Sequence, residues 1–526
     1  MKKLIIFIIT FTVALCSIIY ELIFSQALTI IFGGTVLRYS VTIGLFLFSL
    51  GIGSFLYRYF NVEKREINFF RIEVLLSILG PGGLLFIILI NSISFSLFYT
   101  NFFQWVLLIL SHIPIILVGI LSGLEIPFLS SMAHENSYFS EVLGFDYLGS
   151  LVGTLIYALY LYPEGGLIFS VLVIGFLNLI VAISFYHIFY TGKHGFIYYF
   201  SLLLLLIYIF LLMNNLAFSE AIQKIYLEKD IKDLYWSLGV PITTIKIIEH
   251  FQTPYQDVTK YAIKYPNPEK NPEDICLNLD RHVQTCDNWT EAYHFGLIDI
   301  PLSLISKKNP EVLLIGGGDW IAINNLKKYN ATIDHVDIDK KFIDYTKTDP
   351  YFVKYHNNSY NYEKLNTYID DGFYFVRNNN KKYDLIVLDL PGIEHDKLLH
   401  LFSVEFYWFL NNGLKDNGFL VTWVYQEEKQ PEHYKILLNT IKKAGFENYL
   451  LYYSYINSNE DVPIEAYHIY AKNQTPELST NKILKHPEKY KNLKWDKILY
   501  NNIKPNSIFH PNYDIIVKRE KIYKED

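Results

Sequence analysis

Residues 1 to about 215 are almost continuously apolar, and this feature constrains the fold more than any other. The hydrophobic stretches are mostly long enough to cross roughly 30 Å of hydrocarbon, so we expect about seven membrane helices. They lie near residues 3–32, 41–59, 73–92, 103–121, 144–162, 166–190 and 196–213. The first stretch runs past Tyr20 and Glu21 without a small-residue cleavage site, which predicts a retained helix and not a removed signal peptide.

The remaining residues carry most of the charge and predict a soluble part. We expect a transmembrane region over 1–215, a linker and small β-subdomain over 216–300, an α/β domain over 301–475, and an irregular Lys-rich tail over 476–526. The net charge of −6 says little about partners, and no basic, aromatic-laced stripe suggests nucleic acid as one. The lipid bilayer is the expected partner of the first region.

Three acidic residues, Glu21, Glu125 and Asp146, fall within or beside the apolar stretches. A charge in hydrocarbon is costly unless it is paired or neutralised. One interpretation is a polar path through the helices, for instance for a cationic amine. The other, which we favour, is that these acids cap helix ends or bond to neighbouring hydroxyl groups.

A glycine turn in the soluble part predicts a nucleoside-binding site. Residues 312–315 form an apolar run that ends in Gly316, Gly317 and Gly318, and a second apolar run ends near Asp337. A buried strand that ends in glycines lets the backbone approach a ligand closely, and an acid closing the next strand can accept hydrogen bonds from two ribose hydroxyls.

The α/β domain should contain a parallel sheet of the Rossmann type. Strands are expected over 312–315, 332–338 and 384–390, with helices starting near residues 319 and 340. Before them, residues 275–285 predict a β-hairpin with Asp280 and Arg281 at its turn.

From about residue 250 to 475 the order of motifs resembles the polyamine aminopropyltransferases, the spermidine synthases. The motifs are Thr253-Pro254-Tyr255-Gln256-Asp257, the hairpin from Leu279 to Gln284, Tyr293-His294, Gly316-Gly317-Gly318-Asp319, Val336-Asp337-Ile338-Asp339, Ile369-Asp370-Asp371-Gly372, Tyr383 to Asp389, and Phe402-Ser403-Val404-Glu405-Phe406-Tyr407. The whole chain is similar to a membrane-embedded branch of that family. This branch is also suggested by Ile19-Tyr20-Glu21-Leu22, Leu121 to Pro127 and Asp146-Tyr147-Leu148-Gly149.

The resemblance implies a fold of the S-adenosylmethionine-methyltransferase type and transfer of an aminopropyl group. The donor would be decarboxylated S-adenosylmethionine, bound as a co-substrate with no permanent cofactor. The acceptor would be an amine such as putrescine, and the product would be spermidine with methylthioadenosine. A homodimer is left open.

The resemblance also implies a role for each matching residue. Asp389 would be the catalytic base, and Asp337 would bind the ribose. The donor site would further contain Gln256, Gly316, Gly318, Asp371 and Gly372, with the last two at the adenine, whereas Tyr293, His294 and Asp319 would lie at the aminopropyl or diamine end.

The sequence departs from the family mainly where the acceptor would bind. Gly392 stands in place of a second acid three residues after Asp389, and Trp289-Thr290 replace an acidic pair before Tyr293. Phe295 replaces an acid after His294. Trp320 replaces a glycine and is expected to narrow the loop. The donor site is therefore expected to be kept, and the diamine pocket to be remodelled.

The cysteines bear on metal binding and on location. Cys16, Cys276 and Cys286 do not combine with histidines at zinc-site spacing, so no metal site is expected. Cys276 and Cys286 flank the hairpin turn symmetrically and could face each other. We expect a multi-pass protein of the plasma or inner membrane. Because the nucleoside donor is made in the cytosol, we expect a cytoplasmic soluble domain with both thiols free, although the positive-inside rule favours the opposite side.

Two alternatives stay open. A methyltransferase-like enzyme using S-adenosylmethionine itself would have the same nucleoside half of the site. A membrane transporter or sensor could instead bind a nucleoside or polyamine without turnover. The intramembrane acids and the altered acceptor residues would suit such a protein.

Overall fold

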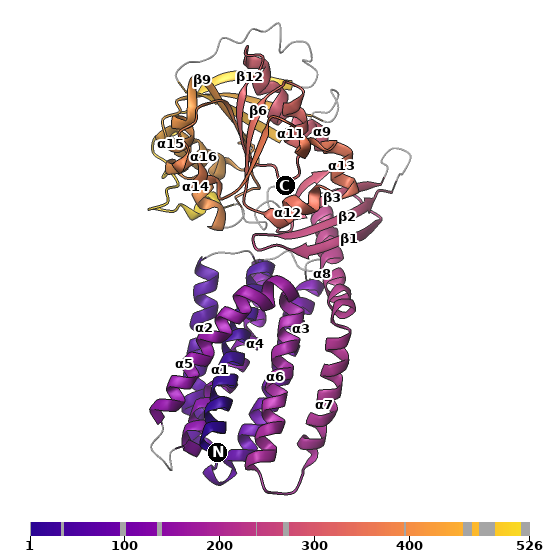
Figure 1. Cartoon of the computed structure of the whole chain (residues 1–526), viewed down its shortest axis with the longest axis vertical. Coiled ribbons are helices and arrows are strands. Elements are labelled where there is room, and N and C mark those ends of the chain that lie inside the picture. Colours follow the sequence, from indigo (N-terminus) through magenta and orange to yellow (C-terminus); the bar gives the residue numbers. More distant parts are fainter. Residues whose placement is uncertain are drawn as a thin grey trace. The chain divides into compact units, whose positions relative to one another are not determined.

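The chain divides into two compact units, Met1–Gly239 and Val240–Asp526, and each is described by itself. The computed structural model (Figure 1) describes residues 2–32, 36–94, 101–133, 139–237, 239–266, 273–393, 396–455, 465–472 and 490–516. The first unit is helical, and the second contains two β-sheets with helices.

The first unit is a bundle of long helices. They are α1 Lys2–Phe32, α2 Val36–Leu56, α3 Arg65–Ser94, α4 Asn101–Ala133, α5 Phe139–Ile156, α6 Gly166–Phe189, α7 Phe196–Met213 and α8 Asn215–Ser237. By length and composition, six helical stretches among the described residues could cross a membrane, and one of them runs for 51 residues over Phe139–Phe189. A straight helix of that length would measure about 77 Å, far beyond the hydrocarbon core.

This long stretch is in fact two helices, α5 and α6. A π-helical turn over Tyr157–Gly165 contains Pro163 and separates them. Gly166 then takes a φ of 69°, which no regular right-handed helix contains. Figure 1 shows α5 and α6 as separate ribbons, so α1 to α7 are compatible with the seven crossings expected from the sequence.

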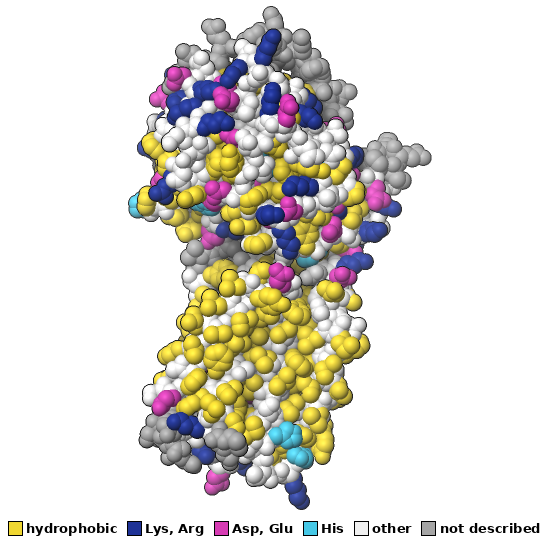
Figure 2. All heavy atoms as spheres, in the orientation of Figure 1, with side chains coloured by type: hydrophobic (Ala, Val, Ile, Leu, Met, Phe, Trp, Pro, Cys, Tyr) yellow, Lys and Arg dark blue, Asp and Glu magenta, His cyan; other side chains and the backbone are white. Residues whose placement is uncertain are grey.

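The outer face of the bundle is apolar, as Figure 2 shows over much of its visible side. Phe48, Phe55, Leu159 and Phe210 each leave 65% or more of their surface exposed. Apolar side chains in this number on the outside of a bundle are suited to lipid contact.

One polar cluster inside the bundle joins side chains of three helices. Glu73 of α3 and Glu125 of α4 are buried and joined by a side-chain hydrogen bond. Asn178 of α6 donates from Nδ2 to Glu73 Oε2 over 3.2 Å. Glu125 therefore pairs with a carboxyl group and does not cap a helix end.

The first part of the segment expected as a linker and small β-subdomain, 216–300, is helix α8. This segment is helical because residues 215–237 contain many strong helix formers and neither glycine nor proline. The charge that follows the last apolar stretch marks the end of an apolar surface and not the end of helical structure.

The second unit begins with a four-stranded antiparallel sheet. Its strands are β1 Thr244–Gln252, β2 Asp257–Lys264, β3 Asp274–Leu279 and β4 His282–Cys286, in that order. Asp280 and Arg281, with φ angles of 48° and 72°, form the two-residue turn between β3 and β4. The predicted hairpin is therefore confirmed.

Cys276 and Cys286 form a disulfide, so the expectation of two free thiols is wrong. The register of β3 and β4 places these two residues directly opposite one another. The pairing follows from the hairpin, which brings the two sulfurs together whatever the rest of the unit does.

The larger sheet has eight strands in the order β12-β10-β11-β9-β8-β5-β6-β7. They are β5 Glu311–Gly316, β6 Thr332–Asp337, β7 Leu365–Ile369, β8 Tyr383–Asp389, β9 Leu414–Val424, β10 Asn448–Ser454, β11 Glu465–Ala471 and β12 Tyr490–Lys497. Strands β9, β8, β5, β6 and β7 run parallel to one another. The chain places β6 and β7 on one side of β5 and then β8 on the other, so the strand order reverses between β5 and β8. A Rossmann-type sheet binds its ligand beyond the carboxyl ends of the strands at such a reversal.

Helices precede and connect the strands of this sheet. They are α9 Thr290–His294, α10 Ile300–Leu304, α11 Ile321–Lys327, α12 Lys340–Thr346, α13 Pro350–His356, α14 Gly372–Asn378, α15 Val404–Gly413 and α16 Pro431–Lys443. The expected strands match β5, β6 and β8, and the helices expected near residues 319 and 340 match α11 and α12.

The expected irregular tail over 476–526 is wrong in its described part. Strand β12 pairs with β10 at the edge of the large sheet. Asn506 is buried and donates from Nδ2 to the carbonyl oxygens of Leu399 and Phe402 over 2.8 and 2.9 Å. Residues 473–489 and 517–526 of the remaining chain lie outside the described residues.

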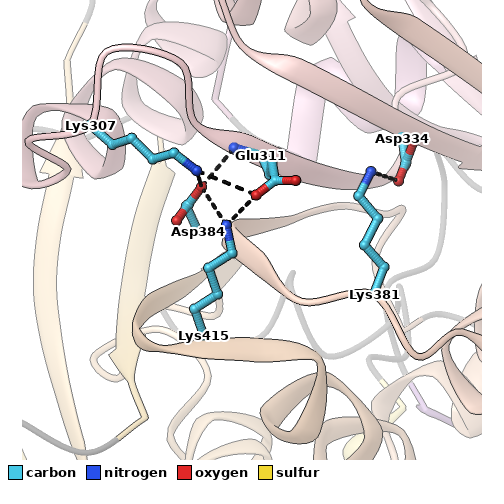
Figure 3. Close-up of polar contacts among 6 residues, drawn as sticks. All are labelled: Lys307, Glu311, Asp334, Lys381, Asp384 and Lys415. Carbon is cyan, nitrogen blue, oxygen red and sulfur yellow. Dashed lines mark hydrogen bonds and ion pairs between the residues drawn. The ribbon is translucent and has the colours of Figure 1, made fainter.

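The amino ends of the central strands carry a network of ion pairs, drawn in Figure 3. Asp384 of β8 accepts from Lys307 and Lys415 over 2.9 and 3.1 Å, and Lys415 also pairs with Glu311 of β5. These charges lie at the edge of the sheet opposite the glycine turn. We therefore assign them to the joining of β5, β8 and β9 and not to the functional site.

Candidate active site

The turn after β5 requires glycine at residues 316 and 317. Gly316 and Gly317 have φ angles of 81° and 74°, in the left-handed region that favours glycine. A Cβ on Gly316 would lie 2.0 Å from the carbonyl oxygen of Asp389, and one on Gly317 would lie 3.0 Å from Asp389 Oδ2. The backbone NH of Gly317 donates to the same carbonyl oxygen over 3.1 Å. The turn therefore holds the end of β5 against the end of β8.

Gly318 leaves room beside Asp337, the acid at the end of β6. A Cβ on Gly318 would lie 2.8 Å from Asp337 Oδ2. Burial raises the pKa of Asp337 to about 7, and hydrogen bonds from the backbone of Asp339 and Gly318 partly oppose this rise. Two further hydroxyl donors from a ribose would favour the ionised form of the carboxyl group.

Gln256 is oriented by Asp339, a residue that the sequence motif contains but to which we gave no role. Gln256 Nε2 and Thr253 Oγ1 both donate to Asp339 Oδ2, over 2.9 and 2.6 Å. Asp339 Oδ1 accepts from the backbone NH of Phe342 and so caps α12. Asp339 thus fixes the loop after β1 beside the glycine turn, and the amide oxygen of Gln256 is the end available to a ligand.

Asp371 caps helix α14. Its Oδ1 accepts from the backbone NH of Tyr374 over 2.9 Å, and its Oδ2 lies 3.1 Å from His400 Nε2. The interaction with His400 lowers the pKa of Asp371. A Cβ on Gly372 would lie 2.7 Å from Ile315 Cγ2, so glycine is needed where α14 meets β5. Each carboxylate oxygen can accept a second bond, which leaves an adenine contact feasible.

Three side chains converge on Asp389 at the end of β8. Tyr293 donates from Oη to Asp389 Oδ1 over 2.9 Å. His294 Nδ1 donates to the carbonyl oxygen of Thr290 over 2.8 Å, which leaves Nε2 buried without a hydrogen-bond partner. That atom lies 3.7 Å from Asp319 Oδ2 and 3.9 Å from Asp389 Oδ2.

Burial raises the pKa of Asp389 to about 6, and the negative charge of Asp319 adds to the rise. His294 and the hydrogen bond from Tyr293 oppose it. A group with such a pKa is ionised in most molecules at neutral pH and can still be protonated. Two partly buried acids this close also favour a positively charged ligand between them.

The same cluster could hold a cation. One ligand atom each from His294, Asp319 and Asp389 lies within 4.8 Å of the others. Such a set suits a metal ion or the ammonium group of a substrate. A second group of this kind, Asp274 with Cys276 and Cys286, cannot ligate through its sulfurs because they form the disulfide.

The positions where the family's acceptor acids would stand hold other side chains. Thr290 is buried at the start of α9, and its carbonyl oxygen orients His294. The Trp289 ring meets the Tyr293 ring edge to face, with centroids 6.1 Å apart. Aromatic surface therefore replaces carboxylates on this side of Asp389.

Trp320 does not act as expected. Its backbone takes a left-handed conformation with a φ of 66°, which a glycine would adopt without strain. Its ring is buried, with its centroid 5.2 Å from that of His335, and its Nε1 donates to the carbonyl oxygen of Ile343. The ring packs in the core, so the strained backbone is the main consequence of this residue.

Tyr467 of β11 belongs to the same site and was missed in the sequence. It donates from Oη to the carbonyl oxygen of Tyr293 over 3.0 Å, and the two ring centroids lie 6.0 Å apart. The only sequence signal was a short strand-like run far from the other motifs, which carries no information about the face on which Tyr467 lies.

The chain is similar in sequence to known proteins of one family. Residues 290–474 match the family model described as the Spermine/spermidine synthase domain. The chain is 31% identical over 448 residues to Polyamine aminopropyltransferase 2 of Aquifex aeolicus (strain VF5), which covers 84% of this chain and 83% of the relative. It is 30% identical over 216 residues to the Polyamine aminopropyltransferase of Saccharolobus solfataricus, covering 40% of this chain and 68% of the relative.

A solved spermidine synthase in complex with the transition state analogue AdoDATO is 21% identical to the chain, covers 44% of it and 75% of the solved chain, and gives a TM-score of 0.37. The match to the Aquifex relative extends well beyond the α/β domain, since it includes 84% of the sequence. This chain is therefore an enzyme of the polyamine aminopropyltransferase family.

Proposed function

We propose that the chain is a membrane-bound enzyme that transfers an aminopropyl group from decarboxylated S-adenosylmethionine to a diamine such as putrescine. The observation that carries this proposal is the position of Asp389. It lies where the strand order reverses, beside the glycine turn, and it is hydrogen-bonded to Tyr293 and faces His294 and Asp319.

The donor would bind along the carboxyl ends of β5, β6 and β7. Asp337 would accept hydrogen bonds from the ribose hydroxyls, and the turn at Gly316 and Gly318 would admit the nucleoside close to the backbone. Asp371 and Gly372 would meet the adenine. The acids Asp319 and Asp389 would then favour the positive charge of the donor's aminopropyl arm and sulfonium.

The chemical step is a displacement at the carbon attached to sulfur. The lone pair of the acceptor nitrogen forms the new N–C bond, and the pair of the broken C–S bond stays on sulfur, which leaves as the neutral thioether methylthioadenosine. The amine must first be uncharged, so a base must take a proton from its ammonium form. Asp389, with a pKa raised to about 6, would accept this proton and pass it to solvent.

The membrane location rests on the first unit. Its apolar helices are long enough to cross a bilayer, and its outer face is rich in exposed apolar side chains. We propose a multi-pass protein of the cell membrane, with the lipid bilayer as its partner.

The full chain, purified in detergent, tests the reaction. Incubation with the decarboxylated donor and a panel of amines should release methylthioadenosine, whereas S-adenosylmethionine should give no S-adenosylhomocysteine. Asp389→Asn should bind methylthioadenosine as the wild type does but lose turnover by about 100-fold or more. Methyl transfer without aminopropyl transfer would refute the proposal, as would tight donor binding without turnover of any amine.

A further inference from the structure

The acceptor pocket lacks the carboxylates expected for a diamine, yet a dication needs an anionic partner at each end. Asp389 and Asp319 can serve the nitrogen that reacts. Gly392, Trp289, Thr290 and Phe295 stand where the resemblance placed the other acids. The far ammonium group of the acceptor therefore needs a different partner.

Glu465, the first residue of β11, lies on the side of the site that Tyr467 forms. Residues two apart on a strand face the same side, so Glu465 and Tyr467 share one face of β11. Tyr467 Oη donates to the backbone of Tyr293 and lies 3.3 Å from Ser454 Oγ, and Ser454 is the register partner of Glu465. Glu465 therefore lies opposite the serine that contacts the Tyr467 hydroxyl group.

Aromatic rings connect Glu465 with Asp389. The Tyr293 and Tyr467 ring centroids are 6.0 Å apart, and the Trp289 ring meets Tyr293 from another direction. The hydroxyl group of Tyr293 donates a hydrogen bond to Asp389. Asp389 thus lies at one end of these rings, and Glu465 lies on the strand face that carries Tyr467, an arrangement that suits a methylene chain with an ammonium group at each end.

Electrostatics agree with this geometry. Burial raises the pKa of Glu465 to about 8, and the hydrogen bond from the backbone of Ala466 and the charge of Lys429 only partly oppose the rise. The charge of Glu465 reaches the phenol groups of both Tyr293 and Tyr467, and contributes to raising the pKa of each after burial. A buried acid in this state gains a favourable partner when an ammonium group arrives, because the ion pair restores its charge.

We propose that Glu465 binds the far ammonium group of an α,ω-diamine acceptor and so determines acceptor specificity in place of the missing carboxylates. This inference rests on the proposed function. The substrate class is a linear diamine whose chain lies along Tyr293 and Tyr467, and not a monoamine or a bulky branched amine.

Glu465→Gln in the full-length protein tests the role of the carboxylate. An amide keeps the size of the side chain and can still accept from the backbone NH of Ala466, which Glu465 Oε1 does over 3.1 Å. We expect the KM for diamines to rise at least about tenfold, with kcat and the KM for the donor within about twofold. The diamines to be assayed have three to five methylene groups between their two nitrogens.

The same variant assayed with n-butylamine separates a charge contact from a general disturbance. This acceptor lacks the far ammonium group, so Glu465→Gln should change its kinetics less than about twofold. Glu447→Gln, at an exposed acid before β10, is the matched control and should change neither acceptor. An equal effect of Glu465→Gln on both amines, or no effect on either, would overturn the proposal.

The failure of this inference differs from that of the proposed function. If wild-type protein releases no methylthioadenosine with any amine, the function is refuted, and the Glu465 contact is then tested by calorimetry. In that case putrescine should bind the protein loaded with methylthioadenosine at least about tenfold more weakly after Glu465→Gln. Unchanged putrescine affinity would overturn the contact independently of catalysis.

Discussion

Gly316 and Asp389 are partners in the register of β5 and β8, and the site where a Cβ of Gly316 would lie is 2.0 Å from the carbonyl oxygen of Asp389. The glycine therefore sets how closely the base candidate approaches the nucleoside turn. Any side chain at residue 316 must push the two strand ends apart.

Gly316→Ala should reduce donor affinity by about tenfold or more and lower stability by about 2 kcal/mol, because it adds a clash to an unfavourable positive φ. Calorimetric titration with methylthioadenosine and thermal unfolding measure the two effects. Gly413→Ala is the control, since a Cβ there meets only Ile386 Cδ1 at 3.5 Å. Equal behaviour of the two variants would contradict the packing argument.

The sequence predicted this part of the fold well because it is coded locally. The apolar run of β5 ends at the glycines, and the turn of the β3–β4 hairpin is marked by Asp280 and Arg281. Strand β12 was missed because it is an edge strand rich in lysine, a composition that protects an edge and hides the strand pattern. Its position depends on pairing with β10, which no local signal contains.

The polar cluster of the helical unit was missed for a related reason. The third apolar stretch was expected to begin at Glu73, which placed this acid at a membrane boundary. Helix α3 begins at Arg65, so Glu73 lies two turns inside it and reaches Glu125 and Asn178. The residues of the candidate site were found from an ordered set of motifs, whereas Tyr467 and Glu465 depend on which face of β11 turns toward the site.

Tyr293→Phe should shift the pH dependence of turnover. Asp389 must be ionised to accept a proton, so kcat at saturating donor and acceptor should rise with pH through about 6. The hydrogen bond from Tyr293 favours the ionised carboxylate. Removal of this hydrogen bond should move the rise of kcat to higher pH by about half to one unit. A pH–rate profile measures the shift. A rise of kcat that moves to lower pH would contradict the contact between Tyr293 and Asp389.

Asp337→Ala should weaken donor binding by about tenfold or more without a comparable loss of kcat, because it removes an anionic acceptor for two hydroxyl groups. The KM of the donor and the affinity for methylthioadenosine report this effect. Loss of affinity for methylthioadenosine alongside retained affinity for adenine would locate the contact at the ribose. Unchanged donor affinity would refute that role.

Substitutions of Trp320 should separate ring burial from backbone strain. Trp320→Ala should lower stability by about 3–5 kcal/mol, because it empties a large buried volume. Trp320→Gly should be about 1 kcal/mol less damaging, because glycine relieves the φ of 66°. Denaturation of the full chain in detergent compares the two variants. A glycine variant less stable than the alanine variant would contradict the strain.

The side of the membrane on which the second unit lies follows from charge and from the disulfide. With seven crossings, one end of the bundle carries the basic residues Lys2, Lys3, Arg58, Lys64, Arg65, Arg71 and Lys193. The other carries Arg38, Lys224, Lys229 and Lys232, on the side where α7 leads into the second unit. The positive-inside rule and a disulfide, which cytosolic reductants would open, both favour the exterior for this unit. The cytosolic origin of the donor favours the interior.

In place of the cytoplasmic side expected from the sequence, we predict the exterior, because two independent observations on the chain agree; both substrates must then reach that side. Lys308→Cys, at an exposed position, in a background of Cys276→Ser and Cys286→Ser gives one accessible thiol in the second unit, since Cys16 is buried. An impermeant maleimide should label it in intact cells as strongly as in lysed cells, and the wild-type protein should be labelled only after reduction. Labelling of the Lys308→Cys variant that requires lysis would place the unit in the cytoplasm, and labelling of Cys276 or Cys286 without reductant would show that the disulfide does not form in the cell.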